Sequence, residues 1–162
     1  MKKIMILMGS NSDWTVMKKA AEIIKEFGVD FEVRVSSAHR TPQKTIEIVE
    51  NFEGSCFIVG AGAAAHLAGV VAAHTTKPVI AVPINATPLN GVDALYSTVQ
   101  MPSGVPVACM AIDGAKNSGL FALQVLALSD KEIKEKLIQF KNKMVVEVNS
   151  KDEDLQNLVK ET

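Results

Sequence analysis

The stretch KKIMILMGSNSDWTVMKKAAEIIKEFG, residues 2–28, carries the pattern that decides the fold. Its short apolar run KIMILM ends at Gly9 and is typical of a buried strand. Between Asp13 and Phe27 the apolar residues recur at spacings of three and four, which predicts an amphipathic helix. Gly28 stands where that helix would end, because glycine readily adopts the left-handed backbone of a helix C-terminus. The stretch therefore predicts a strand, a loop and a helix.

The same alternation continues along the chain. A second helix is predicted to begin at Thr41-Pro42, and another to run from Asn117 to Leu128. Further strand-like runs occupy 31–36, 56–60, 78–83 and 105–112. The buried face of the second helix is predicted to consist of Ile46, Val49 and Phe52. This alternation indicates βαβ units, and hence a parallel sheet with helices on both faces. We expect one α/β domain over residues 1–162, with its core at about 1–128.

The remaining residues, 129–162, predict a helical extension. Ser129 to Glu132 fit a capping box, and Ser150 to Glu153 fit a second one that would begin a short last helix. Between the two boxes, apolar residues form one narrow helical stripe: Ile133, Leu137, Phe140 and Met144. The stripe could pack on its own domain or dock on a neighbouring subunit, and the sequence leaves both possibilities open.

Composition narrows the class of protein. Of 162 residues, 48 % are apolar and 22 % charged, and the formal net charge of −1 gives no electrostatic basis for binding nucleic acid or an anionic membrane. Cys56 and Cys109 lie in apolar runs, which favours buried, reduced thiols. Apolar runs fall short of the roughly 20 residues that span a membrane, and the first apolar run is too short for a signal peptide. We expect a soluble, cytoplasmic protein.

Polar and small residues gather in the loop after the first strand, at 8–13. Gly9 allows a tight turn, while Ser10, Ser12 and the N–H groups of the following helix suit a phosphate. Asp13 suits ribose hydroxyls instead, because a carboxylate accepts hydrogen bonds. The alternative is simple N-capping of the helix by Ser12 or Asp13.

The loop after the second strand reads SSAHRTP, residues 36–42. Arg40 could clamp a phosphate through its planar fork of donors. His39 could transfer a proton, because imidazole exchanges protons near neutral pH. The alternative is a surface His-Arg pair at a helix N-terminus, where a cation is unfavourable unless an anion lies nearby.

The loop after the third strand reads GAGAAAHLAG, residues 60–69. It matches G-x-G-x-x-A, but it does not follow the first strand, and 80–86 contains no acidic residue for a ribose, so we reject a dinucleotide site. The segment instead offers a wall of small residues for a ligand pressed close to the backbone. Taken alone, His66 is typical of a structural histidine and His74 of a surface one.

Together these motifs resemble the PurE family, the N5-carboxyaminoimidazole ribonucleotide mutases of purine biosynthesis. The matching stretches run in the family's order over about 3–128: MGSNSDW, SAHRTP, GAGAAAHLAG, LNGVDALYSTVQMPSGVPVA and NSGLFALQVLA. The resemblance implies a three-layer, flavodoxin-like (Rossmann-like) α/β/α subunit, a homo-octamer with sites shared between chains, and no metal or organic cofactor. The implied substrate is a phosphorylated aminoimidazole ribonucleotide.

The resemblance also implies roles for individual residues. His39 would be the general acid and base. Ser10, Asp13 and Arg40 would bind the ribose phosphate, and Ser12, Ser37 and Ala38 would assist. The carboxyl group that moves would lie against Gly62, Ala63, His66 and Leu67.

The chain departs from the family pattern at two positions of the third loop. The family usually has Gly where Ala63 stands and Pro where Ala68 stands. The added methyl of Ala63 would narrow the pocket or shift a backbone torsion. The helix before the third strand is also about one turn short.

Three rival functions remain. The carboxylase branch of the family uses free carbon dioxide, and it usually has Lys in place of Arg40 and lacks the His66 motif. A carboxylase of nickel-pincer cofactor synthesis would need an additional N-terminal region. A non-catalytic nucleotide-binding module would need the phosphate loops but not His39.

Overall fold

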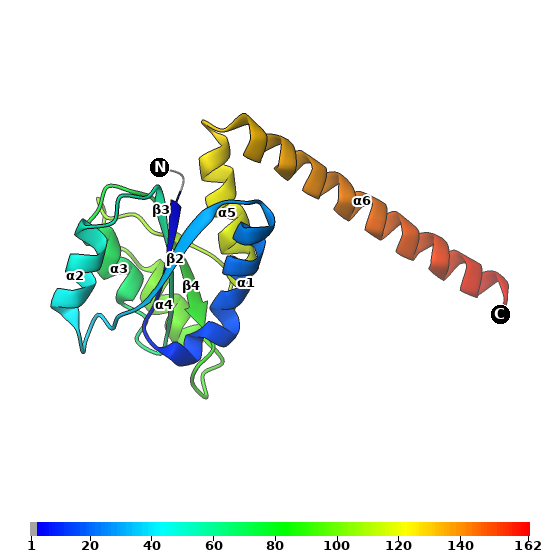
Figure 1. Ribbon diagram of the computed structural model, residues 1–162. Coiled ribbons are helices and arrows are strands. Elements are labelled where there is room, and N and C mark those ends of the chain that lie inside the picture. Colours follow the sequence, from blue (N-terminus) through cyan, green and yellow to red (C-terminus); the bar gives the residue numbers. More distant parts are fainter. Residues whose placement is uncertain (1–2) are drawn as a thin grey trace.

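The computed structural model describes residues 3–162 and has a parallel five-stranded sheet at its centre (Figure 1). The strand order is β2-β1-β3-β4-β5, the flavodoxin-like order. The strands are β1 Lys3–Met8, β2 Asp30–Val35, β3 Cys56–Gly62, β4 Val79–Ile84 and β5 Ala108–Cys109. The predicted α/β class, with its parallel sheet and helices on both faces, is confirmed.

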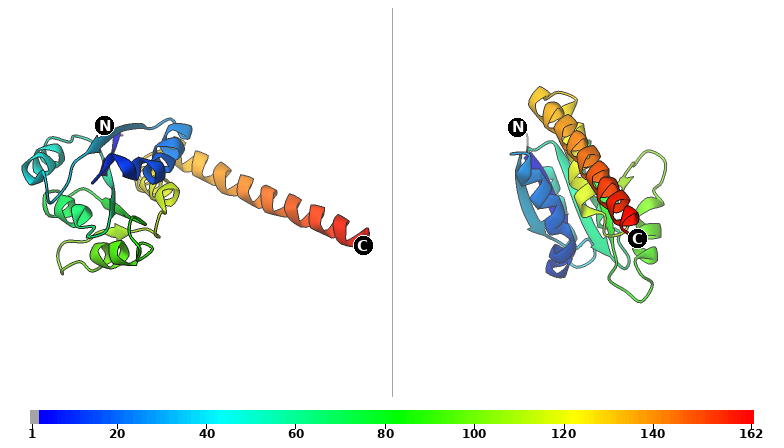
Figure 2. Two further views of the ribbon diagram at one scale, coloured as in Figure 1. Left: turned by 90° about the horizontal axis from the view of Figure 1, so that it is seen from below. Right: turned by 90° about the vertical axis from the view of Figure 1, so that its right-hand side faces the viewer.

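Helices cover both faces of the sheet, as the views from below and from the side show (Figure 2). One face packs against α1 Trp14–Glu26 and α5 Ala115–Ala127, and a short 3-10 turn, η1 Asn11–Asp13, precedes α1. The other face packs against α2 Pro42–Glu50, α3 Leu67–Ala73 and α4 Val92–Val99. Alternate residues of β1 enter the two cores, which is why its apolar run has no polar interruption.

Several elements differ from those predicted. The segments that form α3 and α4 were not predicted to be helical, and α5 begins at Ala115 rather than Asn117. β5 has only two residues, since Pro106 in the predicted 105–112 strand cannot donate a ladder hydrogen bond. In α2, Ile48 is buried and Ile46 only half-buried, because the buried face repeats through Thr45, Ile48, Val49 and Phe52.

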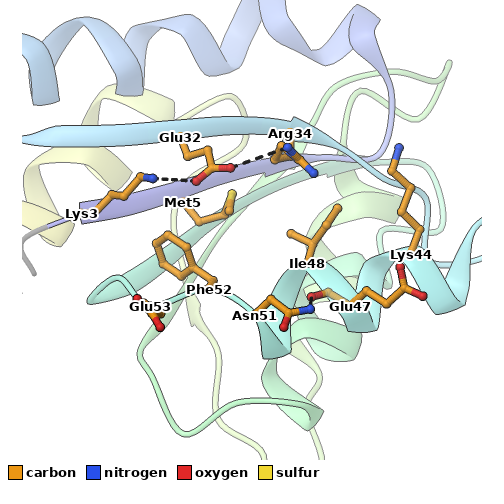
Figure 3. Close-up of a pocket in the computed structure, with 10 residues that line it drawn as sticks. All are labelled: Lys3, Met5, Glu32, Arg34, Lys44, Glu47, Ile48, Asn51, Phe52 and Glu53. Carbon is orange, nitrogen blue, oxygen red and sulfur yellow. Dashed lines mark hydrogen bonds and ion pairs between the residues drawn. The ribbon is translucent and has the colours of Figure 1, made fainter.

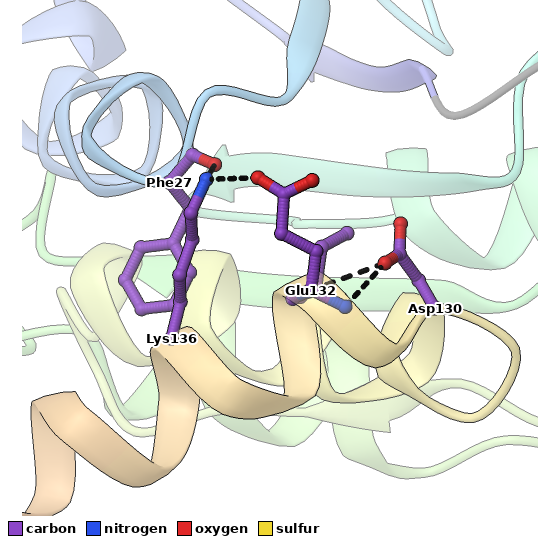
Figure 4. Close-up of polar contacts among 5 residues, drawn as sticks. Phe27, Asp130, Glu132 and Lys136 are labelled. Carbon is purple, nitrogen blue, oxygen red and sulfur yellow. Dashed lines mark hydrogen bonds and ion pairs between the residues drawn. The ribbon is translucent and has the colours of Figure 1, made fainter.

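The C-terminal extension is one continuous helix, α6 Lys131–Lys160, so the predicted second capping box at Ser150 is wrong. The first box is also misplaced by one residue. Asp130 is the N-cap, and its carboxylate accepts hydrogen bonds from the N–H groups of Glu132 at 2.9 Å and Ile133 at 3.2 Å (Figure 4). Ser129 instead donates to the carbonyl of Leu126, within the turn that ends α5.

The first turns of α6 contact the C-terminal end of α1. The Lys136 ammonium donates to the Phe27 carbonyl at 3.1 Å and pairs with Glu132 at 2.7 Å (Figure 4). The rings of Phe27 and Phe140 lie 6.0 Å apart, and Ile133 is buried in the same core. Packing on the chain's own domain is therefore correct for the start of the predicted stripe. Beyond it, α6 projects away from the domain (Figures 1 and 2).

Two smaller predictions concern the cysteines and the membrane. Cys56 is buried, and this burial raises the pKa of its thiol to about 12, whereas Cys109 is only half-buried. Among residues 3–162, no helix is both long and apolar enough to cross a lipid bilayer.

Candidate active site

The loops that follow β1, β2 and β3 meet at one edge of the sheet. They leave β2, β1 and β3, which are neighbours in the strand order, and the edge is the topological switch point between β1 and β3. A cavity of about 370 Å³ lies between them. It is lined by ten of the predicted residues: Ser10, Ser12, Asp13, Ser37, Ala38, His39, Arg40, Gly62, Ala63 and Leu67.

Backbone capping shapes the first loop, and of the two residues expected to cap, Asp13 takes part, in a capping box with Ser10. Ser10 is the N-cap of η1, and the Asp13 carboxylate accepts a hydrogen bond from the Ser10 N–H at 3.0 Å. The Ser12 hydroxyl donates to the Ser10 hydroxyl at 2.9 Å. Burial raises the pKa of Asp13, and hydrogen bonds from the backbone of Ser10 and Gly9 oppose that shift. Capping explains the turn, and it leaves a buried carboxylate and two hydroxyls along the cavity.

Arg40 connects the second loop to the first. Its Nη2 donates to the Gly9 carbonyl at 3.3 Å and its Nε to the Ser37 hydroxyl at 3.3 Å. The Ser37 hydroxyl also accepts from the Arg40 N–H, and Thr41 accepts from the Ser37 N–H at 2.9 Å. The guanidinium is thereby held at the N-terminus of α2 beside the cavity, where an anionic ligand would offset the repulsion between its charge and the helix dipole.

Backbone geometry explains the small residues of the third loop. A Cβ on Gly62 would lie 2.5 Å from the Ala86 side chain and 3.2 Å from the Ile84 carbonyl, so only glycine fits. Ala63 lines the cavity and has a φ of 54°, in the left-handed region that favours glycine. Its methyl group therefore forms part of the cavity wall and makes the left-handed backbone conformation at this position unfavourable.

The two histidines of the site touch each other. His39 Nε2 lies 2.9 Å from His66 Nδ1, and the rings meet edge to face with an interplanar angle of 81°. One nitrogen must donate and the other accept, so the contact holds one proton. His66 does not line the cavity; it contacts His39 instead. Sequence reasoning could not find this pair, because 27 residues separate its members and no local pattern links them.

The structure adds lining residues that the sequence did not indicate. Ala86 follows the end of β4 and lies directly against Gly62 in the cavity wall. Its position after a strand of the parallel sheet was the available signal. His74 lies away from the cavity, exposed and 4.0 Å from Glu50.

A second hollow, of about 500 Å³, lies beside β2 (Figure 3). Glu32 lies there between Lys3 at 2.8 Å and Arg34 at 3.7 Å, and the hydrogen bond from Lys3 lowers the pKa of Glu32. Charges of both signs line this groove, as is common along an edge strand that must not pair with another chain. Within residues 3–162, no three His, Cys, Asp or Glu side chains are grouped so as to hold a metal ion.

Comparison with known proteins identifies the family. The family model for AIR carboxylase matches residues 3–147. The chain belongs to the AIR carboxylase family. Within it, the chain is 54 % identical to a protein of Methanocaldococcus jannaschii named N5-carboxyaminoimidazole ribonucleotide mutase, over 97 % of this chain and 99 % of the relative. A protein of Thermotoga maritima with the same name is 48 % identical, over 98 % and 94 % of the two chains.

A solved structure confirms the fold of this AIR carboxylase family member. The crystal structure of Treponema denticola PurE matches with a TM-score of 0.88 at 30 % identity, over 96 % of this chain and 99 % of that one. The resemblance to PurE drawn from the sequence motifs is therefore confirmed, and so is the flavodoxin-like architecture.

Proposed function

We propose that this chain is an N5-carboxyaminoimidazole ribonucleotide mutase, an isomerase of purine biosynthesis. Its relatives of that name match at 54 % and 48 % identity over nearly the whole chain. The observation that carries the proposal is the His39–His66 contact beside a cavity formed by the loops that follow β1, β2 and β3. An imidazole that exchanges protons lies next to groups suited to a ribose phosphate, which is what a carboxyl shift on a ribonucleotide needs.

The first and second loops would hold the substrate. Arg40 and the hydroxyls of Ser10, Ser12 and Ser37 would bind the phosphate, since guanidinium, hydroxyl and helix N-terminal groups all donate to phosphate oxygens. Asp13 would accept hydrogen bonds from ribose hydroxyls. Because these groups come from rigid ends of neighbouring strands, they would fix the imidazole ring of the substrate relative to His39.

His39 would transfer a proton twice. Protonated His39 gives its proton to the exocyclic nitrogen, the nitrogen–carboxyl bond breaks, and carbon dioxide leaves. The electron pair of ring carbon 4 then attacks that carbon dioxide, and neutral His39 removes the proton from carbon 4. Protons and electrons balance, so no co-reactant is consumed. The His66 contact fixes which ring nitrogen of His39 faces His66, and leaves the other for the substrate.

The third loop would retain the carbon dioxide. Gly62, Ala63 and Leu67 present small or apolar surface with no side-chain group that would hydrogen-bond water. Keeping both fragments together avoids a bimolecular encounter, which can contribute about 7–11 kcal/mol in well-oriented reactions. Ala38 would line the same enclosure from the second loop.

The two nearest rivals are less well supported. A carboxylase that uses free carbon dioxide shares the scaffold, but the relatives in M. jannaschii and T. maritima are named mutases. A binding module without catalysis would have no need for an imidazole pair at 2.9 Å beside its cavity.

We also propose a homo-octamer, in a cytoplasmic location. The exposed apolar side chains of α6 beyond Met144, including Val148, Leu155 and Val159, support a neighbouring copy as their partner. Burial of such side chains is the main driving force for association.

A turnover assay without ATP, bicarbonate or metal tests the function. Purified protein is mixed with N5-carboxyaminoimidazole ribonucleotide, and the carbon-carboxylated product is followed against spontaneous decarboxylation. We expect wild-type turnover and its loss in His39→Asn, while His74→Asn, the same change at an exposed histidine, keeps it. Turnover only with aminoimidazole ribonucleotide and high bicarbonate would make the chain a carboxylase, and near-full activity in His39→Asn would rule out the proton-transfer role.

A further inference from the structure

We infer that Ser97 and Thr98, adjacent residues of α4, are positioning residues that hold His66 against His39. The inference rests on the proposed function for its kinetic consequence, but its structural part does not. Neither residue lines the cavity. Both act through the backbone of Ala65, the residue immediately before His66.

The two side chains bind both polar backbone groups of Ala65. The Ala65 N–H donates to the Ser97 hydroxyl at 3.0 Å, and the Thr98 hydroxyl donates to the Ala65 carbonyl at 3.3 Å. Ala65 and Thr98 are buried, at 1 % and 3 % exposure, so these backbone groups have little access to water. Losing either hydroxyl would leave a buried backbone group without its partner, which a loop would relieve by moving.

The hydroxyl of Ser97 is itself fixed. It donates to the Asp93 carbonyl at 2.8 Å, one turn earlier in α4, while it accepts from Ala65. Its proton faces two further carbonyls, those of Ala94 at 3.2 Å and Ala63 at 3.4 Å, and Ala94 anchors α4 in the core at 0 % exposure. The hydroxyls of α4 therefore set the position of the third loop relative to this helix.

The loop needs this restraint because it is strained and small. Ala63 has a left-handed φ of 54°, a conformation that persists only where neighbouring structure enforces it. Residues 63–65, between the end of β3 and His66, are all alanine, so only methyl groups are available to set the loop's position by packing. The α4 hydroxyls provide that position, and a shift of one ångström at Ala65 would break the 2.9 Å contact between His66 and His39.

The first test reads the histidine rings directly and needs no turnover. The chain has only three histidines, so nitrogen-resolved NMR of the imidazoles separates His39, His66 and the remote His74. We expect wild-type His39 and His66 to show complementary tautomers across their contact. Thr98→Val, which keeps shape and removes the hydroxyl, and Ser97→Ala should remove that coupling and leave His74 unchanged. Thr98→Ser keeps the hydroxyl and should keep the coupling.

A matched control separates positioning from general loss of stability. Ser118→Ala removes another buried hydroxyl, which donates to the Ala115 carbonyl within α5, on the other face of the sheet from α4. It should leave the coupling intact. Unchanged His39 and His66 signals in both Thr98→Val and Ser97→Ala would overturn the inference, whether or not the chain turns over the ribonucleotide.

Kinetics then tests the consequence. Thr98→Val should lower kcat by about tenfold to a hundredfold, with KM within about twofold, because the phosphate loops are untouched. In a His66→Asn background the same change should have little further effect, since Thr98 acts through His66. Fully additive losses would show that it does not, and absence of turnover in the wild type would count against the proposed function alone.

Discussion

Ala63 has a strained backbone at the candidate site. Its φ of 54° costs a non-glycine residue about 1–2 kcal/mol. A glycine at this position would remove that strain. Glycine also loses more backbone entropy on folding, and this loss offsets part of the stabilisation. We therefore expect Ala63→Gly to raise the free energy of unfolding by about 0.5–1 kcal/mol in urea titrations.

The neighbouring alanine provides the control. Ala64 is exposed and has no positive φ, so Ala64→Gly should pay only the entropic cost and lower stability by about 0.5–1 kcal/mol. Opposite signs at adjacent positions would identify the backbone conformation as the cause. Equal losses in both variants would show that residue 63 is not left-handed in solution.

At Asp13 the proposed function and the stability of the fold conflict. Burial raises the pKa of its carboxyl, so the folded state holds the proton at pH values where the unfolded state has lost it. Stability contributed by this group is therefore lost as pH rises through its raised pKa. We expect Asp13→Asn to be at least as stable as wild type at pH 7 while it loses affinity for the ribonucleotide.

The pH dependence of the stability difference tests whether burial of the Asp13 charge is its cause. The stability difference between Asp13→Asn and wild type, measured by urea unfolding, should shrink as pH falls from 7 towards 4. A difference that stays constant over this range would mean that burial of the charge is not responsible. Asp152→Asn, on the exposed end of α6, should show no such trend.

Motifs of the sequence predicted most of the cavity wall but not its internal contacts. Strand-end loops with serines, His39 and Arg40 are local patterns, and a parallel sheet necessarily brings such loops together. The His39–His66 contact and the left-handed Ala63 depend on how distant segments pack, which no local spacing encodes. Ala86 was not predicted either, although its position after β4 was an available signal.

Among the elements, α6 depends on the cap that begins it. The Asp130 carboxylate accepts two backbone N–H bonds, whereas Ser129 caps nothing in α6. We expect Asp130→Ala to lower the free energy of unfolding by about 0.5–2 kcal/mol and to speed hydrogen exchange at the amides of Glu132 and Ile133. Ser129→Ala should change stability by less than about 0.5 kcal/mol. A larger effect at Ser129 would restore the capping box predicted from the sequence.

Elements were predictable where their periodicity was strong. β1, α1 and β3 have clear apolar patterns and lie close to the predicted bounds. The helices α3 and α4 were missed because alanine, valine and glycine dominate the first, and the second is short and has an apolar outer face. Their helical state is set by packing on the sheet, which overrides weak local preference.

At the scale of the whole molecule, the domain covers only part of the apolar face of its last helix, α6. One face of α6 begins in the core at Ile133 and packs on α1 through Phe140. The same face continues at spacings of four, seven and four through Met144, Val148, Leu155 and Val159, all exposed. A 30-residue helix is about 45 Å long, so its second half extends well past the domain. A continuous apolar face that is half-buried and half-bare needs a second surface to cover the rest.

We expect Leu155→Lys and Val159→Lys to weaken the proposed octamer. Each change places a charge where an apolar side chain would be buried, which costs about 1.5–3 kcal/mol in lost burial alone and raises the dissociation constant about tenfold to a hundredfold. Light scattering coupled to gel filtration should show the particle mass falling at a given concentration, with unchanged helical content by circular dichroism. Val146→Lys adds the same charge off this face, at a position 67 % exposed, and should leave the mass unchanged. A monomeric wild type, or three variants of equal mass, would show that this face is bare in solution and that the octamer does not form through α6.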